Sequence, residues 1–193
     1  MDEKGKVIVV SAPSGAGKSS LCSYLVKNIP ELHFSVSYTT RAPRNGEKNG
    51  REYFFTDESD FEKRIRQGEF AECARVHGNY YGTSKKYIEN AAKKGENILL
   101  EIDVQGAAQI KKALPESFLI FILPPSFEEL KSRLVKRATD SEEIIEKRLS
   151  AAADEMSKAD LFDYQIINDN FEKASAELAD LVTSAINNKL DVS

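Results

Sequence analysis

The sequence predicts an α/β fold in which a largely parallel sheet is flanked by helices, because short apolar runs alternate with helical patterns. Apolar runs typical of buried parallel strands begin at Val7, Ile98 and Phe118, and a shorter one begins at Tyr164. Between about residues 36 and 85 the pattern changes to alternating apolar and polar residues with several glycine turns. That stretch predicts a β-rich insertion built from short strands and hairpins.

Glycine and proline signals divide the first half of the chain into elements. The β-branched run over 7–10 predicts a strand, and leucines at helical spacing predict a helix over 18–28 that Pro30 stops. The same kinds of signal predict, in order, short strands and hairpins over 34–55, a helix over 57–68, a strand and turn over 76–83, and a helix over 85–95 that ends at a glycine cap.

Strands and helices alternate regularly in the second half. Apolar runs predict strands over 98–103, 118–123 and 164–168. Helical spacing predicts helices over 109–114, 127–136, 142–156 and 171–189. The helices over 127–136 and 142–156 are rich in charge and stand on either side of a polar turn. This alternation indicates βαβ units and therefore a parallel sheet.

Composition and charge exclude several classes of protein. The 193 residues carry 27 basic and 31 acidic side chains, a formal net charge of −4, which argues against a general binder of nucleic acid or anionic membranes. The two cysteines, Cys22 and Cys73, have no zinc-ligand spacing and are typical of reduced thiols. No apolar run is long enough for a signal-peptide core or a spanning helix. We therefore expect a soluble, cytoplasmic protein.

A glycine-rich loop between the first strand and the first helix nearly matches the Walker A pattern, GxxxxGK[ST]. Gly15 and Gly17 allow backbone N–H groups to turn inward, and the helix N-terminus adds donors for an anion. Lys18 supplies a positive charge for the β- and γ-phosphates, and Ser19 supplies a hydroxyl for Mg²⁺. Ala12 stands where the pattern has its first glycine. The loop predicts a nucleoside triphosphate site in a P-loop NTPase core, and the alternative is a chance glycine- and serine-rich loop.

Three further clusters of residues narrow the choice among nucleoside-triphosphate-binding proteins. Hydroxyls and arginines are concentrated over 35–44, which suits a second anion site, although a solvated polar loop would have the same composition. Glu72 and the segment 78–83 form a second cluster of polar and aromatic residues. Basic residues on the two charged helices form a third, which can neutralise transferring phosphates or can simply be a solvated helix surface.

Five segments, taken in order, resemble the guanylate kinase family: VSAPSGAGKSS, SVSYTTRAPRNGEKNGREYFF, GNYYGTS, EIDVQGA and KRLSAA. The resemblance extends from about residue 7 to about 170, and its second segment is far more specific than the phosphate loop. It implies a single domain with a core (about 1–34, 91–124 and 157–193), a GMP-binding insertion (about 35–90) and a helical lid (about 125–156). It implies ATP-dependent phosphorylation of GMP, and of dGMP, to the diphosphate in purine nucleotide metabolism, with domain closure.

The resemblance also implies residue roles. GMP would be bound by Ser37, Arg41, Arg44, Tyr53, Glu72, Tyr81, Thr83, Glu101 and Asp103. ATP would be bound by Ser14, Gly15, Ala16, Gly17, Lys18, Ser19, Ser20, Asn168 and Asp169. The catalytic groups would be Lys18, Arg44, Arg137 and Arg148, and Mg²⁺, the implied cofactor, would be held with the ATP phosphates by Ser19, with Asp103 as a second candidate ligand.

Two positions depart from the family pattern. Glu101 stands where the family often has aspartate, and Ala138 stands where glycine is frequent. The expected partners are the small molecules ATP and GMP, with no nucleic acid, membrane or obligate protein partner.

Two other functions remain as alternatives. One is a guanylate-kinase-like scaffold module that binds peptides without catalysis, although such modules usually lose the phosphate loop. The other is a different nucleoside monophosphate kinase or NTPase switch, against which Glu72 and the segment 37–44 argue.

Overall fold

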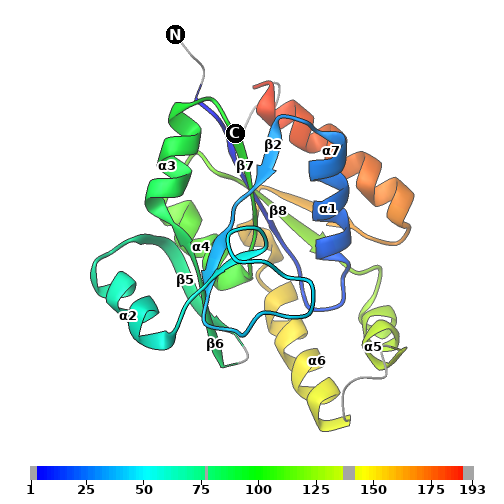
Figure 1. The fold of residues 1–193 in the computed structure, drawn as a ribbon. Coiled ribbons are helices and arrows are strands. Elements are labelled where there is room, and N and C mark those ends of the chain that lie inside the picture. The colour runs from blue at the N-terminus through cyan, green and yellow to red at the C-terminus, as the bar shows by residue number, and fades with distance from the viewer. Residues whose placement is uncertain (1–3, 77, 137–141, 189–193) are drawn as a thin grey trace.

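The computed structural model describes residues 4–76, 78–136 and 142–188. A parallel sheet lies at its centre, with helices α1 and α7 on one face and helices α3 and α4 on the other (Figure 1). A smaller sheet extends below α3 and α4, and helices α5 and α6 extend below α1. The predicted α/β fold, with a parallel sheet between helices, is confirmed.

The larger sheet has five strands among the described residues, and all its neighbouring strands pair in parallel. Its strands, in spatial order, are β2 (Leu32–Phe34), β7 (Asn97–Glu101), β1 (Val7–Ser11), β8 (Phe118–Leu123) and β9 (Tyr164–Ile167). In the centre, Val9 lies opposite Leu100 on one side and Leu119 on the other. Because the strands are parallel, the loops that follow them meet at one edge of the sheet.

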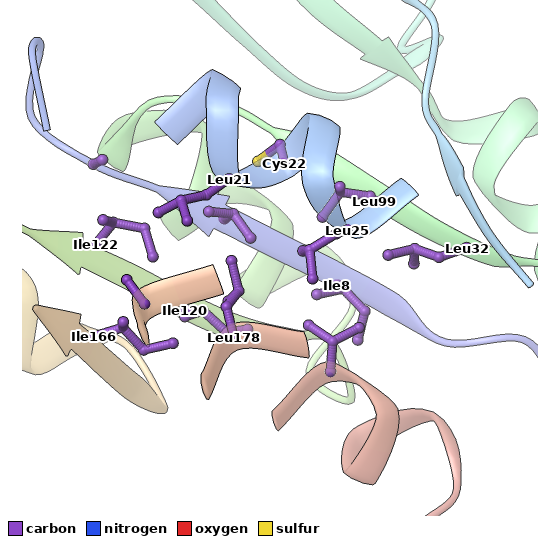
Figure 2. Close-up of a cluster of buried hydrophobic side chains, with 14 of the residues drawn as sticks. Ile8, Leu21, Cys22, Leu25, Leu32, Leu99, Ile120, Ile122, Ile166 and Leu178 are labelled. Atoms are coloured by element: carbon purple, nitrogen blue, oxygen red, sulfur yellow. The ribbon is translucent and has the colours of Figure 1, made fainter. Parts of the chain in front are cut away.

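Alternating residues of β1 divide the core between the two helical layers. Ile8 and Val10 face the layer formed by α1 (Lys18–Asn28) and α7 (Phe171–Ile186). Figure 2 shows Leu21 and Leu25 of α1 with Leu178 of α7 packed over this face of the sheet. The other face is covered by α3 (Lys85–Lys93) and α4 (Val104–Ala113). Full burial on both faces explains the continuous apolar runs of the central strands.

The smaller sheet lies within residues 37–84 and has the strand order β4-β3-β6-β5. Its strands are β3 (Ser37–Thr39), β4 (Tyr53–Phe55), β5 (Phe70–Val76) and β6 (Asn79–Ser84), and helix α2 (Glu58–Arg66) precedes β5. The insertion is β-rich, as predicted, but only some of its neighbouring strands pair as hairpins. Strands β5 and β6 are antiparallel neighbours, whereas β3 pairs in parallel with β4 across a long loop.

Two predicted boundaries were wrong for identifiable reasons. Strand β5 begins at Phe70 rather than near 76, because the buried Glu72 interrupts the apolar pattern. Helix α4 begins at Val104 rather than 109, because the Asp103 side chain accepts a hydrogen bond from the backbone N–H of Gly106 and caps the helix there.

The charged helices α5 (Phe127–Lys136) and α6 (Glu142–Met156) share a small apolar cluster of their own. Leu130 and Leu134 of α5 pack there against Leu149 of α6. A short 3-10 turn, η1 (Ala159–Leu161), leads from α6 to β9. Within the part of the chain that the structure describes, no helix combines the length and apolar character needed to cross a bilayer.

Truncation of Leu178 tests the packing of α7 on the sheet. Leu178 is fully buried among the residues of Figure 2, so Leu178→Ala should lower the free energy of unfolding by about 2–5 kcal/mol. Leu161→Ala is the matched control, because Leu161 is 64% exposed and its truncation should change stability by less than about 0.5 kcal/mol. Urea denaturation of both variants measures the difference, and equal losses would contradict the described core.

Candidate functional site

The glycine-rich loop joins β1 to α1 at the carboxyl edge of the parallel sheet. Gly15 and Gly17 have φ of 98° and 95°, a left-handed conformation that favours glycine. The Asn168 side-chain amide donates to the carbonyl of Ala16 at 2.7 Å. A Cβ on Gly17 would lie 2.4 Å from the Asn168 nitrogen, so position 17 also lacks space for a side chain. Asn168, 152 residues away in sequence, thus supports the shape of the loop.

Lys18 and Ser19 fasten this loop to the end of β7. The Lys18 ammonium donates to the backbone carbonyl of Ile102 at 2.9 Å. The Ser19 hydroxyl donates to Glu101 at 2.5 Å. Both bonds span more than 80 residues, and together they bring two loops of the sheet edge into contact.

The oxygen groups beside the loop fit Mg²⁺ bound together with phosphates. Ser19 offers a hydroxyl that is hydrogen-bonded to Glu101, and Asp103 lines the same cavity as Ser19. Among the described residues no group of three or more acidic, histidine or cysteine side chains could hold a metal by itself. This donor set fits the coordination preference of Mg²⁺, which usually binds through few protein ligands together with substrate phosphates and water.

Two cavities adjoin at this edge. The first, about 310 Å³, lies over the phosphate loop and includes residues Ser14 to Ser20 apart from Ala16 in its lining. The second, about 230 Å³, lies between the sheet edge and the smaller sheet. Lys18 and Asp103 line both cavities. A ligand in one cavity would therefore meet a ligand in the other at Lys18.

The second cavity contains a buried carboxylate, that of Glu72. Its side chain is only 3% exposed, and the hydroxyl of Thr83 donates to it at 2.6 Å. The Ser37 hydroxyl lies 3.1 Å from that of Thr83, so a chain of hydroxyls ends at the carboxylate. Burial, with a smaller contribution from the charge of Asp103, raises the pKa of Glu72 to about 7. A Cβ on Gly106 would lie 2.8 Å from the Glu72 carboxylate, which is too close for a side chain. The glycine at position 106 therefore leaves room for that carboxylate.

Two aromatic rings line one side of the second cavity, and an arginine packs against one of them. Tyr53 and Tyr81 line it, with ring centroids 5.9 Å apart at an angle near perpendicular. The Arg41 guanidinium lies 5.4 Å from the Tyr53 centroid and forms an ion pair with Glu47 at 2.9 Å. The hydrogen bond to Glu47 raises the pKa of Arg41, and the same bond lowers the pKa of Glu47. Arg44 is exposed, and its backbone N–H donates to Glu47.

Helix α6 reaches the phosphate loop. The Arg148 guanidinium donates to the Ser14 hydroxyl at 2.7 Å. Arg137 and Ala138 lie outside the described residues. Asn168 is buried, whereas Asp169 is exposed and accepts a hydrogen bond from the backbone of Asn170.

The structure brings most of the expected site residues to the linings of the two cavities. The expected residues that are described but do not line either cavity are Ala16, Arg41, Arg44, Thr83, Arg148, Asn168 and Asp169. Three contributors had no individual role predicted from the sequence, although two of them, Glu47 and Arg133, belong to the predicted polar and basic clusters. Glu47 orders the loop that carries Arg41 and Arg44, and Arg133 of α5 donates to the carbonyl of Asn168 at 3.2 Å. Glu155 of α6 lines the phosphate-loop cavity. Glu155 had no sequence signal, because an acidic residue on a charged helix is typical of a solvated surface.

Comparison with known proteins decides the family. A family model described as guanylate kinase matches residues 4–185. The chain belongs to the guanylate kinase family. The guanylate kinase of Thiobacillus denitrificans is 51% identical over 93% of this chain and 86% of its own length, and that of Carboxydothermus hydrogenoformans is 49% identical over 94% and 89%. A crystal structure of guanylate kinase from Anaplasma phagocytophilum matches with a TM-score of 0.74 at 35% identity, covering 94% of this chain and 86% of that one.

The raised pKa of Glu72 makes the stability of this guanylate kinase depend on pH. Below the ordinary carboxyl pKa of 4.5 the group is protonated in both the folded and the unfolded chain, and the burial of charge costs nothing. As pH rises through about 7 the folded chain loses that advantage, which amounts to roughly 3 kcal/mol.

Glu72→Gln should therefore gain stability relative to the wild type between pH 5 and pH 8. Urea denaturation at the two pH values measures the gain. Glu89→Gln, an exposed carboxylate on α3, is the control and should give the same difference from the wild type at both. A Glu72→Gln difference that is also independent of pH would contradict the burial of an ionisable carboxyl.

Proposed function

We propose that this guanylate kinase transfers the γ-phosphoryl group of ATP to GMP and to dGMP, giving ADP and the diphosphate. The observation that carries the proposal is the pair of adjoining cavities that share Lys18 and Asp103. One cavity is lined by a phosphate-binding loop, and the other contains a buried carboxylate beside two hydroxyls. The membership of the family, and the names of relatives near 50% identity, support the same reaction.

Glu72 is the proposed reader of guanine. An ionised carboxylate can accept two hydrogen bonds side by side, from the N1–H and the exocyclic amine of the base. Adenine has no donor at N1, so AMP would leave the buried carboxylate without one partner. Thr83 donates to the carboxylate and pairs in turn with Ser37, so both hydroxyls would extend the polar surface for the base edge. A site built to hydrogen-bond a particular group discriminates strongly against a ligand that lacks it.

The GMP phosphate is assigned to Ser37, Arg41, Arg44, Tyr53 and Tyr81. Glu101 and Asp103 would lie near GMP and Mg²⁺ at the sheet edge. Tyr53 and Tyr81 line the cavity, and Arg41 lies over the Tyr53 ring. Glu47 neutralises Arg41, so the phosphate would compete for a guanidinium that is already ordered. The exposed Arg44 is free to turn toward either phosphate. These proposed contacts are made to the base and the phosphate and not to the 2′-hydroxyl of the sugar. We therefore expect dGMP to be an acceptor as well.

ATP is assigned to the phosphate loop and the residues around it. The N–H groups from Ser14 to Ser20 and the Lys18 ammonium would bind its phosphates, and Asn168 and Asp169 would lie near adenine. Mg²⁺ held with the phosphates at Ser19, with Asp103 as a second candidate ligand, would neutralise the negative charge of the transferring group. Arg148, already at Ser14, and Arg137 would add positive charge from the lid.

The chemistry needs positioning and charge neutralisation more than a catalytic base. An oxygen of the GMP phosphate is already anionic and forms the new bond to the γ-phosphorus. The bond from that phosphorus to the bridging oxygen breaks in line, and its electron pair stays on the ADP β-phosphate. The insertion (35–90) and the lid (125–156) would close on the core (1–34, 91–124 and 157–193), which excludes water and prevents hydrolysis of ATP.

A panel of four acceptors tests the proposed reaction. With MgATP as donor, the purified protein should phosphorylate GMP at least a hundredfold more efficiently, by kcat/KM, than AMP, CMP or UMP. Coupled detection of ADP measures all four.

Glu72→Gln should raise the KM for GMP at least tenfold and leave the KM for ATP within about twofold, because the variant removes one acceptor from the base site only. Equal turnover of GMP and AMP by the wild type would contradict the guanine assignment.

A further inference from the structure

Glu155 belongs to the lid helix α6, yet it lines the cavity over the phosphate loop. The roles proposed above do not use it. Its carboxylate is more than half buried, in a cavity whose other charged side chains are Lys18 and Asp103. An acidic side chain in a cavity assigned to a polyphosphate is unexpected, because like charges repel.

Two residues of α6 reach the phosphate loop or its cavity. Arg148 and Glu155 are seven positions apart and therefore lie on one face of the helix. Arg148 donates to the Ser14 hydroxyl at 2.7 Å. Burial raises the pKa of the Glu155 carboxyl, while the charge of Lys18 and the backbone N–H of Ser14 oppose that rise. Glu155 thus lines one cavity together with Ser14 and Lys18, which carry groups that a phosphate would use.

We propose that Glu155 is an internal anion of the phosphate loop that sets the affinity for the triphosphate by competing with it. Without a nucleotide, its carboxylate offsets part of the positive charge of Lys18 in the cavity. A bound triphosphate must displace the carboxylate or tolerate its negative charge nearby, so Glu155 weakens binding. The proposal rests on the proposed function, since it takes the ligand of this cavity to be ATP.

The alternative role for Glu155 is support of the loop by a hydrogen bond to one of its N–H groups, without competition. Substitution by glutamine separates the two roles, because an amide oxygen can accept the same hydrogen bond but carries no charge. A supporting role predicts unchanged or weaker nucleotide binding in Glu155→Gln. A competing role predicts tighter binding.

Calorimetric titration with the non-hydrolysable analogue AMP-PNP and Mg²⁺ at pH 8 tests the proposal. Glu155→Gln should bind the analogue roughly three- to tenfold more tightly than the wild type. Glu155→Ala should also bind at least as tightly as the wild type. Glu146→Gln removes an exposed charge from the same helix and should change the affinity by less than twofold. GMP affinity should be unchanged in all three variants, which also shows that they are folded.

The outcomes separate this proposal from the proposed function. Normal AMP-PNP binding by the wild type, with equal or weaker binding by Glu155→Gln, overturns the role of Glu155 and leaves the proposed function standing. Failure of the wild type to bind AMP-PNP at all contradicts both.

Discussion

The site depends on the attachment of the phosphate loop to the end of strand β7. Lys18 and Ser19, adjacent at the start of α1, hydrogen-bond to Ile102 and Glu101 at the end of the neighbouring strand. Parallel pairing of β1 with β7 brings these ends together, and Asp103, which follows, caps α4. Both cavities take residues from this junction. Displacement of either strand end would separate the phosphate-loop cavity from its neighbour.

Electrostatics explain how an acidic chain can serve two phosphate-bearing ligands. The net charge of −4 describes the whole surface, whereas Lys18 and Arg148 converge on the phosphate loop. Acidic groups also lie at the site, and three of them accept hydrogen bonds: Glu72 from Thr83, Glu101 from Ser19, and Asp103 from the backbone N–H of Gly106. These hydrogen bonds lower the cost of burying the carboxylates.

Sequence reasoning was most successful where one local pattern determines an element. The helix over 18–28 and the strand over 118–123 were predicted with their observed bounds, because helical spacing and a continuous apolar run are local signals. The parallel pairing of β3 with β4 was missed because it depends on contacts across a long loop. Strand β5 was missed in part because the burial of Glu72 is a tertiary effect. The contribution of Glu155 depends on where α6 lies, which periodicity does not report.

The central claim is that the two cavities hold two nucleotides whose phosphates meet at Lys18. An adenosine and a guanosine joined by five phosphates would fill both cavities at once, and calorimetry can compare its affinity with that of ATP and of GMP alone. We predict binding at least a hundredfold tighter than either nucleotide, because the second half binds intramolecularly. The matched compound with two adenosines should bind much more weakly. An affinity for the adenosine–guanosine compound no greater than that of ATP would contradict the claim.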